Sequence, residues 1–498
     1  MDSLRIYGAE NISHIAVDLG ASGGKMFLGE VNEELKVEEI YRFDNRPVES
    51  GDRYVWDVEY LREEILKGIR KAERKTGAFD SIGIDTWGLD FGLIKDGELM
   101  RDPYSYRDPK MKSTLDEILE ETSKEEIFKA TGINHWNVPN TLWQYHYISR
   151  KEPEVLEKAE KMIMMPQLIS FLLGAEICGE ETIASTSQMF DPRTRDWAES
   201  FLTELDLRVD ILPELKEPGT RIGKLREDFA AGLENRPEIL LPVSHDTGAA
   251  VAGMPLGEGH RAFLSTGSWF ILGIELEQPK LSTEAFQIEA SNEMGVEGTA
   301  RFLKNINGFF ILEECRKEWR KNDQIYEYDR LIEKVREIDS LGPLINPDAN
   351  PFQTVEGDMT QKIASFCRDT GQEVPETEGE ITQCIFESLA LKTVMAFESL
   401  MEVAGTESDL IHLGGGGTRN EFFCEMLASI MGIPVLGGPV EAAACGNILT
   451  QAMAYNEIED IKEGRELVKE SMEFQRFEPE EDEGWDEAEE TMRDLLSD

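Results

Sequence analysis

Two segments about half a chain apart follow the same pattern, and this repetition is the feature that most constrains the fold. Residues 14–28 read HIAVDLGASGGKMFL and residues 261–272 read RAFLSTGSWFIL, in a chain of 498 residues. In each, an apolar run leads into a polar residue, a glycine turn and a second apolar run, which predicts a β-hairpin. Two such hairpins indicate a duplicated domain with a nucleotide held between the halves, although two unrelated hairpins would give the same pattern.

The rest of the chain alternates strand-like and helix-like runs, which is typical of an α/β protein. Predicted strands cover residues 14–19, 26–31 and 81–86, predicted helices cover 60–76, 113–131, 141–150, 153–161 and 380–403, and a strand–glycine–helix unit covers 410–431. A linker rich in glycine and proline at 252–259 predicts a division into domains 1–253 and 254–498. The acidic end, residues 477–498, predicts a solvated helix or a frayed tail.

The charge balance narrows the classes of partner. With 51 basic and 99 acidic residues, the formal net charge is −48. Nucleic acids and anionic membrane surfaces both need basic contacts, so the charge argues against either as a partner. Self-repulsion of this size destabilises a compact protein, and we therefore expect a high-salt cytoplasm in which screening is strong.

No segment predicts export or a membrane span. The N-terminus MDSLRIYGAE lacks the basic start and apolar stretch of a signal peptide. The most apolar stretch, Met162–Cys178, is interrupted by polar residues and glycine and predicts a buried core segment. The six cysteines form no CxxC pair, which is ordinary intracellular usage. We expect a cytoplasmic protein that is a monomer or a small homo-oligomer.

The first candidate site is the stretch from Asp18 to Lys25, DLGASGGK. Small residues let backbone N–H groups approach an anion, so Ala21, Ser22, Gly23, Gly24 and Lys25 are predicted to bind phosphate. Asp18 is predicted to hold Mg²⁺, because a carboxylate is unsuited to contact phosphate directly. A tight turn that binds nothing is the alternative.

The second candidate site is Ser244-His245-Asp246-Thr247-Gly248, after a strand-like run and before a run of small residues. An aspartate at this place can accept a proton from a substrate hydroxyl as a general base. Ser, Asp and Thr are also common residues at helix starts, so a helix cap explains the local sequence equally simply.

Three further stretches offer ligand contacts. In FLSTGSW at 263–269, Thr266, Gly267 and Ser268 are predicted to receive phosphates. In IHLGGGGTRN at 411–420, the glycines, with Gly415 and Gly416 at their centre, would let a nucleobase or ribose lie against bare backbone. In DTWGLDF at 85–91, Trp87 offers a face to a sugar ring and the acids offer hydroxyl partners, unless Trp87 is simply a core residue.

Taken together and in this order, the motifs resemble the FGGY carbohydrate kinases of the actin, sugar kinase and chaperone-ATPase superfamily. The resemblance covers nearly the whole chain and includes AVDLGASGGK at 16–25, SIGIDTWGLDF at 81–91, SHDTGAAV at 244–251, FLSTGSW at 263–269, EGTARFLKNINGFFILEEC at 297–315 and GPVEAAACGN at 438–447. The DTWG-x-DF and SHDT stretches are similar to the rhamnulokinase branch of that family.

The resemblance implies an α/β fold of two ribonuclease-H-like domains, each a mixed sheet flanked by helices, with a cleft between them. It implies ATP-dependent phosphorylation of the 1-hydroxyl of L-rhamnulose, with Mg²⁺ near Asp18 and with Asp246 as proton acceptor. The implied sugar contacts are Gly88, His245, Asp246, Thr247 and Asn305, beside Trp87. The implied ATP contacts are Ala21 to Lys25, Ser268, Glu313 and Gly416.

Three residues depart from the family pattern. Lys25 stands where arginine is more usual, Ser268 replaces threonine, and Glu313 replaces glutamine and so brings a negative charge near the nucleotide. Cys367 and Cys384 match a pair that can be bridged in a relative, but we expect them to be reduced in a cytoplasmic protein. A kinase for another ketose, such as L-fuculose or xylulose, and a non-catalytic nucleotide or sugar sensor remain alternatives.

Overall fold

The computed structural model describes residues 12–259, 261–321, 326–338, 340–354, 356–480 and 484–497. The backbone divides into two units, and each is built from several chain segments. Unit 1 comprises the chain up to Pro255 together with Glu275–Phe302 and Glu441–Met472. Unit 2 comprises Leu256–Ile274, Leu303–Val440 and the chain from Glu473 onward.

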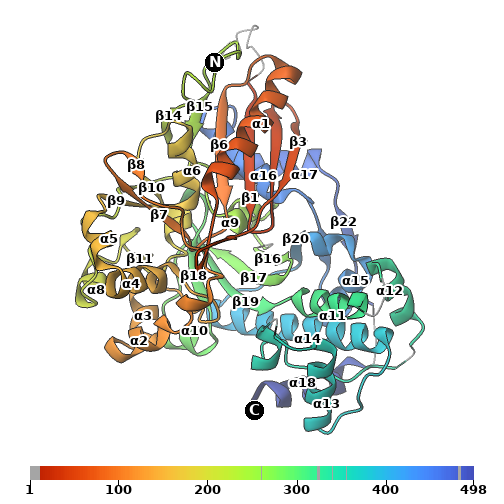
Figure 1. Ribbon diagram of the computed structural model, residues 1–498. Helices are drawn as coiled ribbons and strands as arrows, with labels where there is room; N and C mark the ends of the chain where they lie inside the picture. The colour runs from red at the N-terminus through yellow and green to blue at the C-terminus, as the bar shows by residue number, and fades with distance from the viewer. Residues whose placement is uncertain are drawn as a thin grey trace. The chain divides into compact units, whose positions relative to one another are not determined.

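Unit 1 is built on a six-stranded mixed sheet (Figure 1). Its order is β14 (Arg221–Lys224), β15 (Glu238–Leu240), β6 (Ser81–Thr86), β1 (His14–Gly20), β2 (Gly23–Val31) and β3 (Leu35–Asp44). Strand β1 pairs antiparallel with β2 and parallel with β6, and β6 pairs parallel with β15. The predicted first hairpin and the predicted strand 81–86 are therefore confirmed.

Helices cover this sheet because each presents an apolar stripe to it. In α1 (Val58–Thr76), Leu61, Ile65 and Ile69 are buried at helical spacing, and the Asp57 side chain caps the first turn by accepting from the Tyr60 N–H. Helix α1 packs on β3, α6 (Met165–Leu173) on β6, and α16 (Ala442–Ala454) on β1, β2 and β6. Figure 1 shows α16, in blue, beside the red strands of the chain's beginning.

Small residues let α16 lie directly against α9 (Asp246–Ala252). A Cβ atom on Gly446 would stand 1.9 Å from the Ala249 carbonyl oxygen, and one on Gly253 would stand 2.1 Å from that of Ala442. Neither residue can carry a side chain without separating the two backbones. The run of small residues after Asp246 thus serves to bring a late segment of the chain against the first sheet.

The remainder of unit 1 is a set of short elements, and many of those between residues 91 and 215 pack around a second apolar cluster. Its helices are α2 (Thr114–Glu121), α3 (Lys124–Thr131), α4 (Thr141–Lys151), α5 (Pro153–Lys158), α7 (Glu181–Ala184), α8 (Glu199–Glu204), α10 (Thr283–Gln287) and α17 (Ile461–Ser471). Its strands are β4 (Val48–Ser50), β5 (Arg53–Val55), β7 (Phe91–Lys95), β8 (Glu98–Leu99), β9 (Lys161–Met164), β10 (Gly179–Glu180), β11 (Phe190–Asp191), β12 (Asp196–Trp197) and β13 (Leu215–Lys216).

Two predicted helices of this region were wrong in extent. The single helix predicted over 113–131 is two helices, because Ser123 and Glu126 form a capping box that starts α3 and ends the run. The helix predicted over 153–161 stops at Lys158, and Lys161 already begins β9. The apolar stretch from Met162 forms β9 and α6 and is largely buried, as predicted.

Most of a seven-stranded sheet belongs to unit 2. The order is β18 (Ser291–Met294), β19 (Ala300–Asn307), β17 (Trp269–Leu276), β16 (Ala262–Thr266), β20 (Ile411–Gly415), β21 (Val435–Gly437) and β22 (Gln475–Phe477). Strand β16 pairs antiparallel with β17 and parallel with β20, and β20 pairs parallel with β21. The pairing of β1 and β2 with their neighbours is thus repeated.

The helices of unit 2 are α11 (Phe310–Lys321), α12 (Tyr328–Arg336), α13 (Met359–Asp369), α14 (Glu378–Ala404), α15 (Glu421–Met431) and α18 (Trp485–Ser497). Helix α14 and the unit of β20 and α15 match the predicted segments. In the acidic end, Gln475–Phe477 pairs with β21 and α18 follows, whereas residues 481–483 and 498 lie outside the described residues.

Two global features complete the fold. None of the helices in the described ranges is long and apolar enough to cross a membrane. All six cysteines are buried, and the structure has no bridge between Cys367 and Cys384, whose reduced state stays a prediction. Each unit has a mixed sheet flanked by helices, and the predicted α/β architecture is confirmed.

Candidate functional site

Strand register places two carboxylates side by side in unit 1. Asp18 on β1 stands directly opposite Asp85 on the parallel strand β6 and opposite Lys25 on β2. Paired residues on neighbouring strands project from the same face of a sheet, so both carboxylates share that face. The Lys25 ammonium lies 2.7 Å from the Glu441 carboxylate at the start of α16.

Burial makes this carboxylate pair costly to ionise. Burial, with a further contribution from the charge of Asp246, raises the pKa of Asp18 to about 7, while Lys25 opposes the rise. Burial and then the charge of Asp18 raise the pKa of Asp85 well above its usual range, against the hydrogen bond donated by Asn447. Asp85 Oδ1 has no partner within the described part of the chain. The pair is therefore suited to hold a proton or a cation.

Asp246 is the first residue of helix α9, and its carboxylate is held by its neighbour. Oδ1 accepts from the Thr247 backbone N–H at 2.6 Å and from the Thr247 hydroxyl at 3.2 Å. The cap position of the helix belongs to His245, which makes no side-chain cap, so the capping interpretation does not account for Asp246. Burial raises the pKa of Asp246 and the neighbouring His245 lowers it, while 30% of the side chain stays exposed.

A buried ion pair holds His245 in place. Arg301 is fully buried, and its Nη2 lies 3.1 Å from His245 Nδ1 and 2.9 Å from the Glu293 carboxylate. His245 Nε2 then lies 3.4 Å from Asp246 Oδ1. Burial alone would raise the pKa of Glu293, but Arg301 and His245 hold it at about 2. Sequence reasoning missed Glu293 and Arg301, because no local pattern relates residues on different strands.

Trp87 is largely enclosed. Its side chain is 5% exposed, its ring centroid lies 4.2 Å from that of Trp56 with the planes tilted by 41°, and it donates its N–H to Asp90. Asp90 also accepts hydrogen bonds from Trp56 and from Gln144. Its carboxylate therefore holds the side chains that form the wall of the site. Gly88 follows at close quarters, since a Cβ there would stand 2.9 Å from the Thr186 hydroxyl. Little of the Trp87 ring is open to a ligand.

The first predicted phosphate loop is the tip of the hairpin between β1 and β2. Gly20 pairs with Gly23, which leaves Ala21 and Ser22 as the two turn residues. Ser22 is exposed and lines a hollow of about 500 Å³. Gly24 is required by packing, because a Cβ there would overlap the Phe43 ring. The loop thus presents its backbone and the Ser22 hydroxyl to solvent, and Lys25 follows on β2.

In unit 2, a cavity of about 450 Å³ collects four of the six residues of this unit that were predicted to contact nucleotide. Gly267, Ser268, Glu313 and Gly416 line it, together with Phe309, Tyr328, Asp329, Ile332, Gly417, Arg419 and Asn420. A Cβ on Gly416 would meet no atom within 4 Å, so its backbone borders open space. The four predicted residues come from three stretches of the sequence that lie far apart.

Thr266 and Gly415 build the cavity rather than line it. The buried Thr266 hydroxyl donates to the Gly414 carbonyl at 2.7 Å and accepts from the Gly417 N–H at 3.0 Å, which ties the glycine turn to the hairpin. Gly415 has φ +84°, and a Cβ there would stand 2.4 Å from the Thr266 carbonyl oxygen. Both residues are therefore committed to the backbone path of the turn.

The charge of Glu313 is balanced within unit 2. Its Oε1 accepts from Arg316 at 2.5 Å and from the Tyr328 hydroxyl at 2.7 Å. Arg316 is 7% exposed, so the ion pair is sheltered. The glutamate that stands at position 313 in place of the usual glutamine is thus paired with Arg316, three residues later on α11. The last predicted sugar contact, Asn305, lies half-buried on β19, in the part of that strand that belongs to unit 2.

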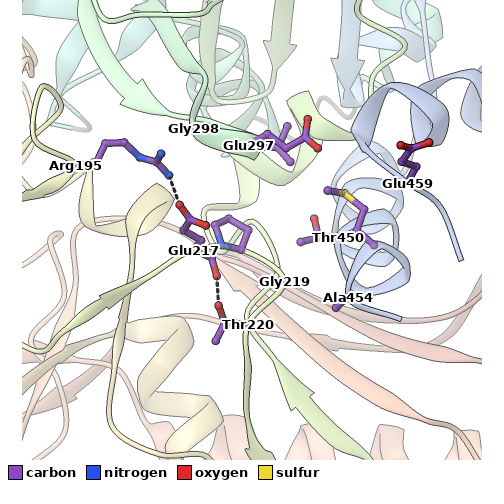
Figure 2. A pocket seen from close by; sticks show the side chains of 12 residues that line it. Arg195, Glu217, Gly219, Thr220, Glu297, Gly298, Thr450, Ala454 and Glu459 are labelled. Carbon is purple, nitrogen blue, oxygen red and sulfur yellow. Dashed lines mark hydrogen bonds and ion pairs between the residues drawn. The ribbon is translucent and has the colours of Figure 1, made fainter. Parts of the chain in front are cut away.

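A further cavity of about 600 Å³ lies elsewhere in unit 1 (Figure 2), and no predicted site residue lines it. Arg195 and Glu217 pair across its wall at 3.0 Å, and the Thr220 hydroxyl donates to the Glu217 carbonyl. Glu297 and Glu459 complete an acidic rim. The cavity is distinct from the carboxylate site around Asp18, Asp85 and Asp246.

The donor set in unit 1 fits a hard divalent cation. No three histidine, cysteine, aspartate or glutamate side chains gather as a metal site in the described ranges. Mg²⁺ is commonly bound by one or two carboxylates together with substrate phosphates and water. The adjacent pair Asp18 and Asp85, with its orphan oxygen, offers that arrangement.

Comparison with known proteins gives a consistent result. Residues 13–253 match the N-terminal domain, and residues 262–455 the C-terminal domain, of the FGGY family of carbohydrate kinases. The chain is 38% identical over 477 residues to a rhamnulokinase of Bacteroides thetaiotaomicron, covering 95% of this chain and 97% of that protein. It is 32% identical over 469 residues to a rhamnulokinase of Bacillus subtilis, covering 94% and 95%.

Solved structures share the fold at low sequence identity. A ligand-bound xylulose kinase from Lactobacillus acidophilus superposes with a TM-score of 0.77 at 15% identity, covering 97% of this chain and 96% of that one. Plasmodium falciparum glycerol kinase with ADP superposes with a TM-score of 0.76 at 15% identity, covering 98% and 97%.

Proposed function

The chain belongs to the FGGY family of carbohydrate kinases, and on that premise we propose that it transfers the γ-phosphoryl group of ATP to the 1-hydroxyl of L-rhamnulose. The observation that carries the sugar's identity is the similarity to rhamnulokinases, at 38% and 32% identity, over at least 94% of the chain. The enzyme class and the use of ATP follow from the family, whereas the ketose is the proposal.

Asp246 is the proposed general base. Its Oδ1 is held by Thr247, and nearly a third of the side chain is exposed to take a proton. Burial raises its pKa, which makes the carboxylate a stronger proton acceptor. The 1-hydroxyl of the ketose would give its proton to Asp246 as that oxygen attacks the γ-phosphorus in line.

His245 would orient both the sugar and the base. Its Nδ1 lies 3.1 Å from Arg301 Nη2 and 3.2 Å from the Glu293 carboxylate, while Nε2 is directed toward Asp246. In a form of the ring that carries a proton on Nε2, that N–H would donate to Asp246 or to a sugar hydroxyl. Gly88 and Thr247 would border the sugar in unit 1, and Asn305 in unit 2 is proposed as a sugar contact on the family resemblance alone.

The cavity in unit 2 is the proposed nucleotide site. Gly416 offers open backbone for a flat ring or ribose, while Gly267 and Ser268 offer N–H and hydroxyl groups to phosphate. Because Arg316 and Tyr328 balance Glu313, that carboxylate adds little repulsion toward ATP. In unit 1, Ala21 to Gly24 and Lys25 would contact the phosphates at the hairpin tip.

Asp18 and Asp85 would hold Mg²⁺, which would supply charge stabilisation for the transferring phosphoryl group. Their pairing on neighbouring strands supports this assignment, because two adjacent carboxylates, of which Asp85 is fully buried, are stabilised by a cation. Lys25 and Glu441 flank the pair and set the net charge around it.

A panel of ketoses tests the proposal. Purified protein, ATP and Mg²⁺ are incubated with L-rhamnulose, L-fuculose, xylulose or no sugar, and ADP release is measured. The proposal expects the highest kcat/KM with L-rhamnulose and a product phosphorylated at the 1-hydroxyl. A higher kcat/KM with another ketose would reassign the substrate, and ADP release that ignores every ketose would favour the sensor alternative.

We further propose a cytoplasmic setting of high ionic strength, which rests on the net charge of −48. ATP is itself polyanionic, so a strongly negative protein repels it at low salt, and added KCl should lower the KM for ATP. A KM that rises steadily with KCl would contradict this proposal.

A further inference from the structure

A buried chain of hydrogen bonds runs through unit 1 and ends at the carboxylate pair. Its members, in order, are Glu457, His14, Ser81, Gln451, Asn447 and Asp85. The successive distances are 2.6, 2.7, 2.6, 2.7 and 2.6 Å. All members except Glu457 are fully buried, so water does not compete for these bonds.

Carbonyl groups fix the direction of the chain. Asn447 Nδ2 faces both the Gly83 carbonyl and Asp85 Oδ2, and a carbonyl oxygen can only accept. The amide nitrogen of Asn447 must therefore point to Asp85, which leaves Asn447 Oδ1 as the acceptor on its other side. This orientation does not depend on how the oxygen and nitrogen of the amide are assigned.

The same argument fixes Gln451, one helical turn further along α16. Its Nε2 faces the Ile15 carbonyl at 3.1 Å and Asn447 Oδ1 at 2.7 Å, so both contacts require the nitrogen to donate. Gln451 Oε1 is then an acceptor, and it faces the Ser81 hydroxyl at 2.6 Å. Ser81 must use its one proton in that bond.

The remaining proton positions follow. Since the Ser81 proton is committed to Gln451, the contact with His14 Nδ1 needs a proton on that ring nitrogen. The opposite nitrogen, Nε2, lies 2.6 Å from the Glu457 carboxylate, so a second proton lies between these two groups. A ring protonated on both nitrogens, paired with a carboxylate that keeps some contact with water, satisfies every contact.

We propose that this chain is the device that positions Asp85, and that it is anchored by a doubly protonated His14 paired with Glu457. It connects β1, β6 and α16, the three elements that carry or cover the carboxylate pair. By donating to Oδ2, Asn447 leaves Asp85 Oδ1 as the free oxygen beside Asp18. His14, Ser81, Gln451 and Asn447 are thus positioning residues, and their effect on turnover rests on the proposed function.

Nuclear magnetic resonance of the histidine side chains tests the direction of the chain without any substrate. The protein has six histidines, and the His14 signals are assigned by their loss in His14→Gln. At neutral pH we expect a proton on both His14 nitrogens in the wild type, and on Nδ1 alone in Glu457→Gln. A wild-type His14 that carries no proton on Nδ1 would reverse the chain and overturn the proposal.

Steady-state kinetics test whether the chain positions Asp85. Ser81→Ala removes the hydroxyl that connects His14 to Gln451, and Ser170→Ala is the matched control, a buried serine of α6 whose hydroxyl donates to Pro166. We expect Ser81→Ala to lower kcat about tenfold, with the KM for ATP changed less than about twofold. The control should stay within about twofold in both constants.

The outcomes separate the positioning role from the proposed function. If the wild type phosphorylates a ketose other than L-rhamnulose, the same comparison is made with that ketose. A folded Ser81→Ala protein with wild-type kcat would overturn the positioning role, whatever the sugar. If Ser81→Ala does not fold, Glu457→Gln takes its place in the assay. An unchanged kcat together with loss of the proton on His14 Nε2 would then show that the His14–Glu457 pair does not anchor the chain.

Discussion

The hairpins β1–β2 and β16–β17 occupy the same position in two sheets of matching strand pairing, yet they carry opposite chemistry. Each has a parallel neighbour on its first strand, β6 in unit 1 and β20 in unit 2. Where register pairs Asp18 with Asp85 in the first sheet, it pairs Ser265 with Gly414 in the second. One backbone arrangement thus supports a pair of carboxylates in unit 1 and small, uncharged residues beside an open cavity in unit 2.

The difference follows from what each site would handle. Charge that develops during phosphoryl transfer calls for groups that accept protons or hold cations, and these are collected in unit 1. A nucleotide of fixed structure calls for bare backbone and space, which the glycines of unit 2 provide. Substitutions should therefore act on turnover in unit 1 and on ATP affinity or stability in unit 2.

The largest expected effect is that of Asp246→Asn. The amide keeps the size of the side chain but cannot accept the proton of the attacking hydroxyl, so kcat should fall by ~10³-fold or more. The melting temperature should remain near that of the wild type. Thr393→Ser, a buried change in α14 of unit 2, is the control. Turnover within tenfold of the wild type would remove Asp246 from the role of base.

The second largest effect is expected in the pH dependence of stability, to which Asp18 in the sheet of unit 1 contributes. Burial raises the pKa of Asp18 from 3.8 to about 7, so the folded protein binds a proton that the unfolded chain has released. The contribution of Asp18 to stability is therefore full at pH values below 3.8 and is lost as pH rises to about 7, by at most about 4 kcal/mol.

Urea unfolding of wild type and Asp18→Asn between pH 5 and 8, without Mg²⁺, measures this loss. The difference in unfolding free energy between the two proteins should shift in favour of the variant as pH rises. A difference that stays constant across this range would show that Asp18 titrates as an ordinary carboxyl group.

Adjacent glycines in unit 2 should separate stability from binding. A Cβ in Gly415→Ala would collide with the Thr266 carbonyl at a positive φ, so this variant should lose about 1–3 kcal/mol of stability. Gly416→Ala places its methyl group in open space and should keep its stability, while the KM for ATP rises several-fold. Thermal melting and ATP titration of both variants check this, and equal melting temperatures would contradict it.

The smallest expected effect is that of Glu313→Gln. Because Arg316 and Tyr328 already satisfy this carboxylate, its removal should change the KM for ATP by less than about threefold. Initial rates at varied ATP give the value. A tenfold fall in KM would show that Glu313 repels the nucleotide despite its partners.

Local patterns in the sequence predicted the elements that depend on neighbours along the chain. The hairpin of β1 and β2, helix α1 and helix α14 were placed from apolar spacing and glycine turns. The prediction over 113–131 was wrong because the apolar spacing continues past Ser123, whose capping box with Glu126 starts a new helix. Asp18, Asp246 and the glycines of 414–417 stood out because such residues are rarely grouped without reason.

The sequence by itself therefore determined the α/β class, the repeated hairpins and most of the residues proposed to meet sugar and nucleotide. The tertiary structure decided which groups share a site. Register set Asp85 beside Asp18, and α16 brought Asn447 against Asp85, with Gln451 bonded to Asn447 behind it. Those relations depend on strand pairing and backbone contact between segments far apart in the sequence, which no local pattern records.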